Sequence, residues 1–409
     1  MLRKMKTIVP IVTIFVLLAS TVLVGSVSAA TPAQGVGKCP QKITIGWAPP
    51  DITGVFKTAT NYFDATAKEA TEKGIPIEVI TQSPASHTSF SDQVAILEDY
   101  IQRKVNVIAL SPIDVNVVKP PIKKANEAGI PVIVVNQLEP IEGLDVTSYI
   151  GFDNTDGGRI SAYAVVDYFG GPGVLGTGAK IDVKPDTILD LKWWQNVFKD
   201  VDPKTAPIKA NIAIIEGIAG SFHSNARLKG FHEIIDAYPG IKIVGTQPAD
   251  WNREKGIKAA EDFLTANPKG SLDGMWAASN EMGLGAALAA EKDGRLAIAG
   301  KTQPNDGTVA IFTNDVTPES ADRMREGKLM AETDHGFPEW GHYGAEFAAT
   351  LACGGKIPLT FDTRPRTMFQ GNADSFYPNR VMEPIKWDEI KAGGSPRMTA
   401  AVTTTTTTK

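Results

Sequence analysis

The sequence predicts an α/β protein whose parallel sheets form two lobes, and three observations support this fold class. Short β-branched runs alternate with longer amphipathic stretches along most of the 409 residues. The short runs are continuously apolar, which is typical of strands that helices cover on both faces of a parallel sheet. Nine such runs are present, more than one compact α/β domain usually holds. We therefore expect two lobes.

The expected strands and helices alternate in order along the chain. The strands lie at residues 43–47, 77–80, 105–110, 132–135, 149–152, 212–215, 241–244, 274–277 and 309–313. Two of the helices between them should end at Gly74 and Gly129, because each glycine is followed by Ile-Pro and proline cannot continue a helix. Another helix should begin at the two prolines 120–121, which fit only a first turn.

Both ends of the chain are expected to lie outside the lobes. Three cations within the first six residues precede an apolar run at 8–24, and small residues follow it. This layout predicts a secretory signal peptide at residues 1–30, with an uncleaved membrane anchor as the alternative. The threonine-rich end, 395–409, is too simple in composition to form a core, so we expect it to be disordered.

Composition narrows the classes of function. Lys and Arg number 41 against 46 Asp and Glu, a net charge of −5, which argues against nucleic acid as a partner. Only two cysteines are present, too few for a four-cysteine zinc module. In an exported protein they can form a disulfide, so we hypothesise a Cys39–Cys353 bridge, with two free thiols as the alternative.

Polar and aromatic residues follow the strands where a ligand is expected. In a doubly wound sheet, ligands bind beyond the carboxyl ends of the strands. Those ends carry residues 47–51, 111–114, 136–137, 217–221, 279–281 and 314–315. Amides, hydroxyls and carboxylates suit hydroxyl groups, and flat rings suit apolar C–H faces. This set predicts a carbohydrate or polyol ligand.

Other motifs in the sequence could indicate a dinucleotide site, a metal site or a catalytic nucleophile, but they lack the neighbouring elements or partner residues that such sites need. The Gly-x-Gly-x-x-Gly run at 171–176 follows a helical pattern rather than a strand, which argues against a dinucleotide site. His223 and His232 are too few for a metal site, and Ser221 lacks the partners of a nucleophile. We therefore expect no enzyme activity, no metal and no cofactor.

An ordered series of motifs carries a family resemblance over residues 42–353. The motifs lie at 111–114, 129–132, 153–158, 217–220, 227–231, 247–251 and 280–285. With them the chain resembles the periplasmic sugar-binding proteins of ABC importers, in the type I group typified by ribose-binding protein. The resemblance implies two Rossmann-like lobes joined by a three-segment hinge, with crossings near 152–153, near His335 and within 369–382. The implied lobes are 40–152 plus 336–370, and 153–335 plus 381–391.

The resemblance also implies a set of ligand-binding residues. Trp251 matches the stacking aromatic, and Asp315 keeps the family's carboxylate. Several positions depart from the family in ways that remove charge, so the implied ligand is a sugar other than ribose, a sugar alcohol or a cyclitol. Arg227 is assigned to structure instead. The expected ligand-binding residues are Trp47, Phe56, Ser111, Asn136, Gln137, Asn225, Trp251, Ser279, Asn280, Asp315 and His335.

The implied function is capture of a sugar or polyol between the lobes and delivery to the membrane permease of an ABC importer. The protein is then expected to be a monomer in the periplasm or outside the cell. A sensor that presents its ligand to a chemoreceptor or histidine kinase is the alternative. Residues 170–210 interrupt the resemblance and contain Trp193 and Trp194. We expect this insertion to pack as a small subdomain, with an exposed partner surface as the alternative.

Overall fold

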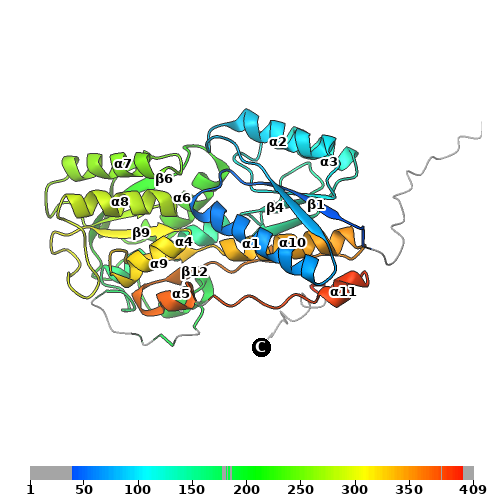
Figure 1. The fold of residues 1–409 in the computed structure, drawn as a ribbon. Coiled ribbons are helices and arrows are strands. Elements are labelled where there is room, and N and C mark those ends of the chain that lie inside the picture. The colour runs from blue at the N-terminus through cyan, green and yellow to red at the C-terminus, as the bar shows by residue number, and fades with distance from the viewer. Residues whose placement is uncertain (1–38, 177–180, 182, 185–186, 379, 399–409) are drawn as a thin grey trace, which may run out of the picture. The chain divides into compact units, whose positions relative to one another are not determined.

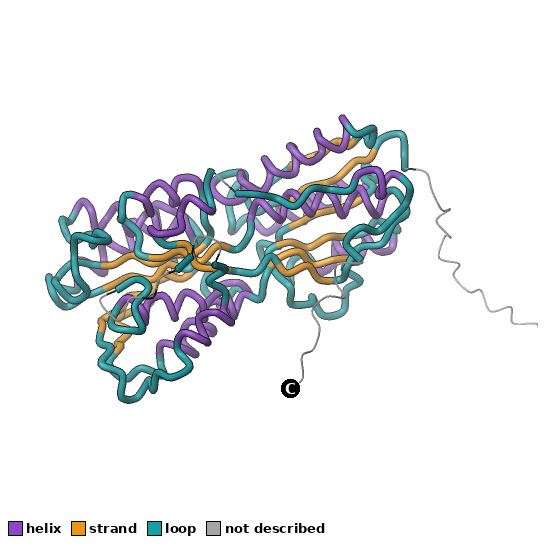
Figure 2. Tube along the Cα trace, turned by 90° about the horizontal axis from the view of Figure 1, so that it is seen from below, coloured by secondary structure: helices purple, strands orange, loops and turns teal. Residues whose placement is uncertain are grey.

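A computed structural model describes residues 39–398, except 177–180, 182, 185–186 and 379 (Figure 1). The predicted signal peptide and positions 399–409 of the predicted tail lie outside these residues. No helix among the described residues has both the length and the apolar character needed to cross a membrane. Two six-stranded sheets organise this part of the chain, each with helices on both sides (Figure 2).

The first sheet is entirely parallel, in the order β11-β5-β4-β3-β1-β2. Its strands are β1 (Ile43–Ala48), β2 (Ile77–Thr81), β3 (Val107–Leu110), β4 (Val132–Val135), β5 (Ser148–Gly151) and β11 (Thr360–Asp362). Its helices are α1 (Gly54–Glu72), α2 (Phe90–Gln102), α3 (Lys119–Glu127), α10 (Phe337–Ala352) and α11 (Trp387–Lys391). The side chains of neighbouring residues on a strand pack in two different hydrophobic clusters, one on each face of the sheet. Ala109 faces the core with α1 and α10, and Ile108 faces the core with α2 and α3.

The second sheet has the order β12-β10-β9-β8-β6-β7 and is parallel except for β12. Its strands are β6 (Ala210–Glu216), β7 (Ile241–Pro248), β8 (Gly274–Ala277), β9 (Ala310–Asn314), β10 (Ala331–Asp334) and β12 (Arg366–Met368). Around it lie α4 (Asn154–Tyr168), α5 (Leu191–Val197), α6 (Phe222–Ile235), α7 (Arg253–Ala266), α8 (Asn280–Lys292), α9 (Pro318–Arg325) and the 3-10 helix η1 (Gln370–Ser375). One apolar cluster joins these elements.

Each of the nine predicted strands overlaps an observed one, and β10, β11 and β12 were not predicted. β10 reads Ala-Glu-Thr-Asp, yet all four residues are buried. Its Asp334 pairs with Arg366 and Arg380, which are distant in sequence, and hydropathy alone cannot reveal such pairing. The predicted helix ends are observed: α1 and α3 stop just before Gly74 and Gly129, whose φ angles are 85° and 72°.

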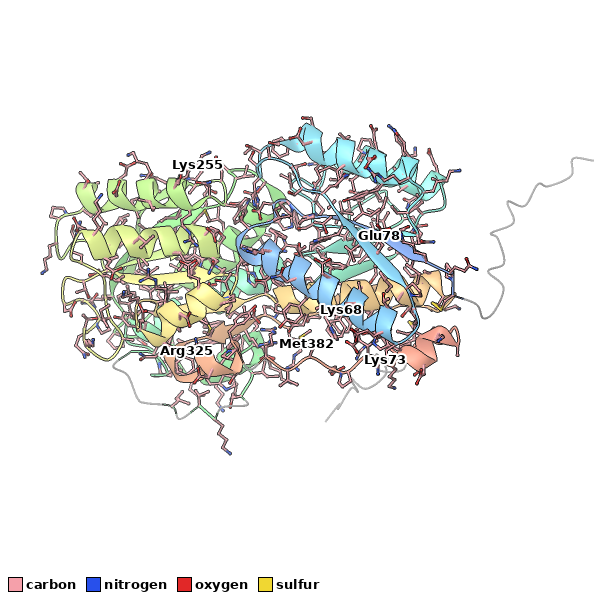
Figure 3. The ribbon with its side chains drawn as sticks, viewed as in Figure 1. Lys68, Lys73, Glu78, Lys255, Arg325 and Met382 are labelled. Carbon is pink, nitrogen blue, oxygen red and sulfur yellow. A yellow bond between two sulfur atoms is a disulfide. The ribbon has the colours of Figure 1, made fainter. Side chains whose placement is uncertain are left out.

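The chain crosses between the sheets after β5 and after β10, near the two positions expected. The chain also crosses between β11 and β12, at 363–365, which was not expected, and it crosses back between Tyr377 and Met382, within the range 369–382 expected for the third crossing. These strands have three residues each, too few to show a hydrophobic pattern. The chain then returns along the segment that carries Met382 in Figure 3. Trp387 and Ile390 pack in the first-lobe core, so the assignment of 381–391 to the second lobe is wrong.

Two smaller expectations concern the cysteines and the insertion. Cys39, ahead of β1, and Cys353, at the end of α10, are joined in a disulfide, as hypothesised. Within the described part of the insertion, Trp194 on α5 is fully buried and donates from Nε1 to Thr367 Oγ1 at 2.8 Å. The insertion therefore packs on the second lobe. Arg397, within the tail 395–409 that was expected to be disordered, forms an ion pair with Glu346.

Candidate ligand-binding cleft

A cleft of about 590 Å³, including space open to solvent, lies between the two lobes. Its lining comes from the carboxyl ends of strands and the first turns of the helices that follow, as expected for doubly wound sheets. The first lobe contributes Pro50, Asp51, Thr53, Gly54, Val55, Phe56, His87, Pro112, Ile113, Asn136 and Phe337. The second lobe contributes His223, Arg227, Trp251, Ser279, Asn280, Glu281 and Asp315.

Asp315 is the centre of the polar side of the cleft. Its Oδ2 accepts a hydrogen bond from Arg227 Nη1 at 3.1 Å, and its Oδ1 accepts one from His335 Nδ1 at 2.5 Å. All three side chains are almost completely buried. Burial by itself would raise the pKa of Asp315, but Arg227 and His335 hold that pKa below its ordinary value. Asp315 is therefore an ionised carboxylate whose two oxygens both have protein partners.

Arg227 is tied to the lobe by several further contacts. Its Nε donates to Asn154 Oδ1 at 3.2 Å, and its Nη1 donates to the carbonyl oxygen of Ala278 at 2.6 Å. The guanidinium lies 5.4 Å from the ring centroid of Trp251, within the range of a cation–π interaction. The sequence assigned Arg227 to structure; the side chain is fixed by structural contacts and also lines the cleft.

Trp251 presents its ring to the cleft from a strained backbone position. It lies three residues beyond β7 with φ 62°, a left-handed conformation that is rare for a bulky residue. The ring lies against Gly217, where a Cβ atom would come within 2.1 Å of Trp251 Cζ2, so this position requires glycine. Asn136 and Asp315 also have positive φ, 77° and 74°. Such strain concentrates at binding sites.

Several polar atoms in the cleft have no hydrogen-bond partner among the described residues. They are Asn136 Oδ1, His223 Nε2 and Ser279 Oγ. Asn280 is oriented by Glu332, whose Oε1 accepts from Asn280 Nδ2 at 2.7 Å. Burial raises the pKa of Glu332 to about 8, so this carboxyl is protonated at neutral pH. The unpartnered atoms are free to bond a ligand.

The first-lobe face consists mainly of rings and paired charges. Phe56 meets Phe337 edge to face, with 5.6 Å between the ring centroids. His87 hydrogen-bonds to Asp51 through Nε2. Asn136 is the exception, because its side-chain oxygen is unpartnered while its backbone carbonyl accepts from Asn154 Nδ2 at 3.0 Å.

Six of the eleven predicted ligand-binding residues line this cleft. They are Phe56, Asn136, Trp251, Ser279, Asn280 and Asp315. Ser111 and Gln137 are buried beside lining residues but do not line the cleft themselves, and His335 contacts Asp315 and stacks on Phe152.

Trp47 and Asn225 are placed elsewhere, contrary to expectation. The Trp47 ring points toward α1, packs 4.7 Å from the ring centroid of Phe63 and donates from Nε1 to Thr60 Oγ1. Asn225 is exposed and donates to the carbonyl oxygen of Gly220 at 3.1 Å. It lies two residues from His223 on α6, on a different face of the helix.

The sequence reasoning missed His87, His223 and Phe337 as lining residues. Asp51 and Glu281 also line the cleft; they belong to the strand-end segments 47–51 and 279–281 but were not among the expected ligand-binding residues. One signal was present for His223. The helix begins at Phe222, directly after the strand-end segment 217–221. Residues four apart share one helix face, so a helix that begins at this point places His223 on the same face as Arg227. Among the described residues, no group of His, Cys, Asp or Glu side chains converges to hold a metal ion.

Comparison with known proteins gives a family and a fold. Residues 45–356 match the periplasmic binding protein domain family. The ribose import binding protein of Salmonella typhimurium is 28% identical over 315 residues, which cover 76% of this chain and 87% of that protein. The D-allose-binding periplasmic protein of Escherichia coli is 26% identical over 326 residues, covering 77% and 89%. A periplasmic solute binding protein of an ABC transporter from Actinobacillus succinogenes, solved with bound D-allose, has a TM-score of 0.64 at 24% identity and covers 81% of this chain and 99% of its own.

Proposed function

The chain belongs to the periplasmic binding protein family, and we propose that it captures a sugar or sugar-like polyol between its lobes and delivers it to the permease of an ABC importer. The relatives named for ribose import and D-allose binding support this class of ligand. In this proposal the protein is exported by its N-terminal signal peptide, acts as a monomer in the periplasm or outside the cell, and catalyses no reaction.

One observation carries the proposal: rings and unpartnered neutral polar atoms face each other across the cleft. Phe56 and Trp251 offer flat apolar surfaces from opposite lobes. Asn136 Oδ1 and Ser279 Oγ offer hydrogen bonds that no described residue uses. A polyhydroxylated ring or chain has apolar C–H faces and hydroxyl edges, and it satisfies both kinds of surface at once.

The two-lobe arrangement also supports a capture mechanism. A ligand that bridges the lobes stabilises the closed form, because both sets of contacts exist only there. At the rim the lobes approach closely: a Cβ atom at Gly54 would lie 2.8 Å from Glu281 Oε1. A permease that distinguishes closed from open forms then accepts loaded protein. Micromolar affinity, about −8 kcal/mol, suits capture followed by release.

A thermal-shift panel tests the proposal. The mature protein, lacking residues 1–30, is heated with pentoses, hexoses, sugar alcohols and cyclitols in turn. A ligand present at 100 times its Kd raises the free energy of unfolding by about 2.7 kcal/mol, so at least one compound should raise Tm by several degrees. Trp251→Ala should reduce this shift, and Trp193→Ala, which removes the same side chain from the insertion, should leave it intact. A panel without any shift, or an undiminished shift in Trp251→Ala, overturns the proposal.

A further inference from the structure

His223 is a buried cleft residue with an unused hydrogen-bonding atom. It lies in the first turn of α6, which follows β6 after the segment 217–221, and only 5% of the residue is exposed. Its Nε2 has no hydrogen-bond partner among the described residues, although the residue lines the cleft. An unpaired polar atom in a protein interior is unfavourable, because it has lost its hydrogen bonds to water. A ligand atom bound at Nε2 removes this cost.

The surroundings of His223 keep its ring uncharged. Burial, and after it the Arg227 guanidinium, lower the pKa of His223 to about 3. Arg227 is four residues further along α6, on the same face of the helix. The Asp315 carboxylate opposes this shift only in part. At neutral pH the ring is therefore a neutral group, and its Nε2 can accept a hydrogen bond from a hydroxyl or donate one to it, according to the tautomer.

The charged side chains of the cleft are already matched within the part of the chain that the structure describes. Arg227 pairs with Asp315, and His87 hydrogen-bonds to Asp51. Glu281 is held by Arg253, which lies outside the lining, through two contacts of 2.8 and 3.0 Å. A ligand carboxylate would be desolvated here with no unpaired cation to receive it, which is costly.

We infer that His223 is a specificity-determining contact of this cleft, whose neutral ring hydrogen-bonds a ligand hydroxyl and makes the protein select neutral sugars and polyols over the corresponding sugar acids. The inference rests on the proposed function and deepens it. It concerns which members of the ligand class bind: His223 supplies a hydrogen bond to a hydroxyl, and the matched charges of the cleft disfavour an acid.

Calorimetric titration with matched neutral and acidic probes tests the inference. The pairs are D-glucose with D-glucuronate, D-galactose with D-galacturonate, and D-ribose with D-ribonate, supplemented by xylitol and myo-inositol. We expect any pair whose neutral member binds to show at least hundredfold weaker binding of the acid.

Variants of two histidines on the same helix complete the design. His223→Ala should weaken binding of the best neutral probe at least tenfold, and His223→Gln, which keeps a neutral hydrogen-bonding group, should stay within about threefold of the wild type. His232→Ala is the matched control, because His232 lies on α6, pairs with Asp236 and does not line the cleft. It should bind like the wild type. Circular dichroism and Tm of each variant verify folding.

The outcomes separate this inference from the proposed function. If no neutral probe of the calorimetric or thermal-shift panel binds, the proposed function fails and the inference fails with it. If a neutral probe binds but its acid binds equally well, or if His223→Ala retains wild-type affinity, the inference alone is overturned and sugar binding stands. Should His223→Ala fail to fold, His223→Gln and the neutral–acid ratio of the wild type still decide the question.

Discussion

The two lobes build opposite kinds of surface on the same cleft. The second lobe presents the buried Arg227–Asp315 pair together with an imidazole, a hydroxyl and an amide. The first lobe presents mainly apolar side chains, among them the Phe56 and Phe337 rings, together with the Asp51–His87 pair and the unpartnered Asn136 Oδ1. The comparison suggests a division of labour. The second lobe selects the ligand by its hydroxyl groups, and the first lobe covers its apolar faces.

Asp315→Ala should give the largest effect, because it removes the partner of a buried cation. The Arg227 side chain is 3% exposed and would lose its carboxylate partner. Breaking a buried ion pair in this way costs about 3–5 kcal/mol of the free energy of unfolding. Chemical denaturation measures this loss. Asp262→Ala, which breaks an exposed pair with Lys258, is the control and should cost about 0–1 kcal/mol. Similar losses in both variants would contradict a central role for the Asp315 pair.

The disulfide should stabilise the first lobe without influencing the cleft. Cys39 and Cys353 are 314 positions apart and lie in the core of α1, α10 and the first sheet. Replacing both with serine should lower the free energy of unfolding by about 2–5 kcal/mol. Affinity for the best probe of the thermal-shift panel should stay unchanged. If the double-serine variant folds like the wild type but binds the probe more weakly, the disulfide also influences the geometry of the cleft.

Aromatic substitutions compare the lobes directly. Trp251→Ala should weaken ligand binding at least tenfold, about 1.4 kcal/mol, because the ring and its contact with Arg227 are both lost. Phe56→Leu keeps an apolar side chain on the first-lobe side of the cleft, so it should weaken ligand binding less, by about threefold. Calorimetry of both variants with one probe ranks them. A larger loss for Phe56→Leu would show that the first-lobe ring contributes more to ligand binding than Trp251 does.

Glu332→Gln should stabilise the protein by an amount that grows as the pH rises. Burial raises the pKa of Glu332 from 4.5 to about 8, so between these values the folded protein holds a proton that the unfolded chain has lost. The carboxyl therefore destabilises the fold increasingly from pH 4.5 to pH 8. Glutamine mimics the protonated acid, so the variant should have a higher Tm than the wild type at pH 8 and an equal Tm at pH 4.5. An equal difference at both pH values would show that Glu332 does not titrate in this range.

The sequence predicted the second-lobe site better than the first, for a physical reason. Trp251, Ser279, Asn280 and Asp315 follow strand ends, where the doubly wound arrangement places ligand contacts. Trp47 also lies near a strand end, but it is still within β1, and strand alternation turns its ring toward α1. The direction of a side chain depends on where the strand stops, which apolar patterning defines only to within a residue or two.

Long-range pairing accounts for what the sequence could not reveal. β10 is buried because Arg366 and Arg380 neutralise Asp334 from another part of the chain. Arg227 was assigned to structure because its cleft position depends on Asp315, which is 88 residues away. Local sequence patterns and the family resemblance were enough to predict the two lobes and the first two crossings. Ion pairs between distant segments required the folded structure.

A crystal structure with the best neutral sugar of the thermal-shift panel tests the central claim most directly. We predict that the sugar lies between Phe56 and Trp251 and makes most of its hydrogen bonds to second-lobe groups, among them His223 Nε2 and Ser279 Oγ. A sugar bound outside this cleft, or bonded mainly to first-lobe side chains, would contradict the account.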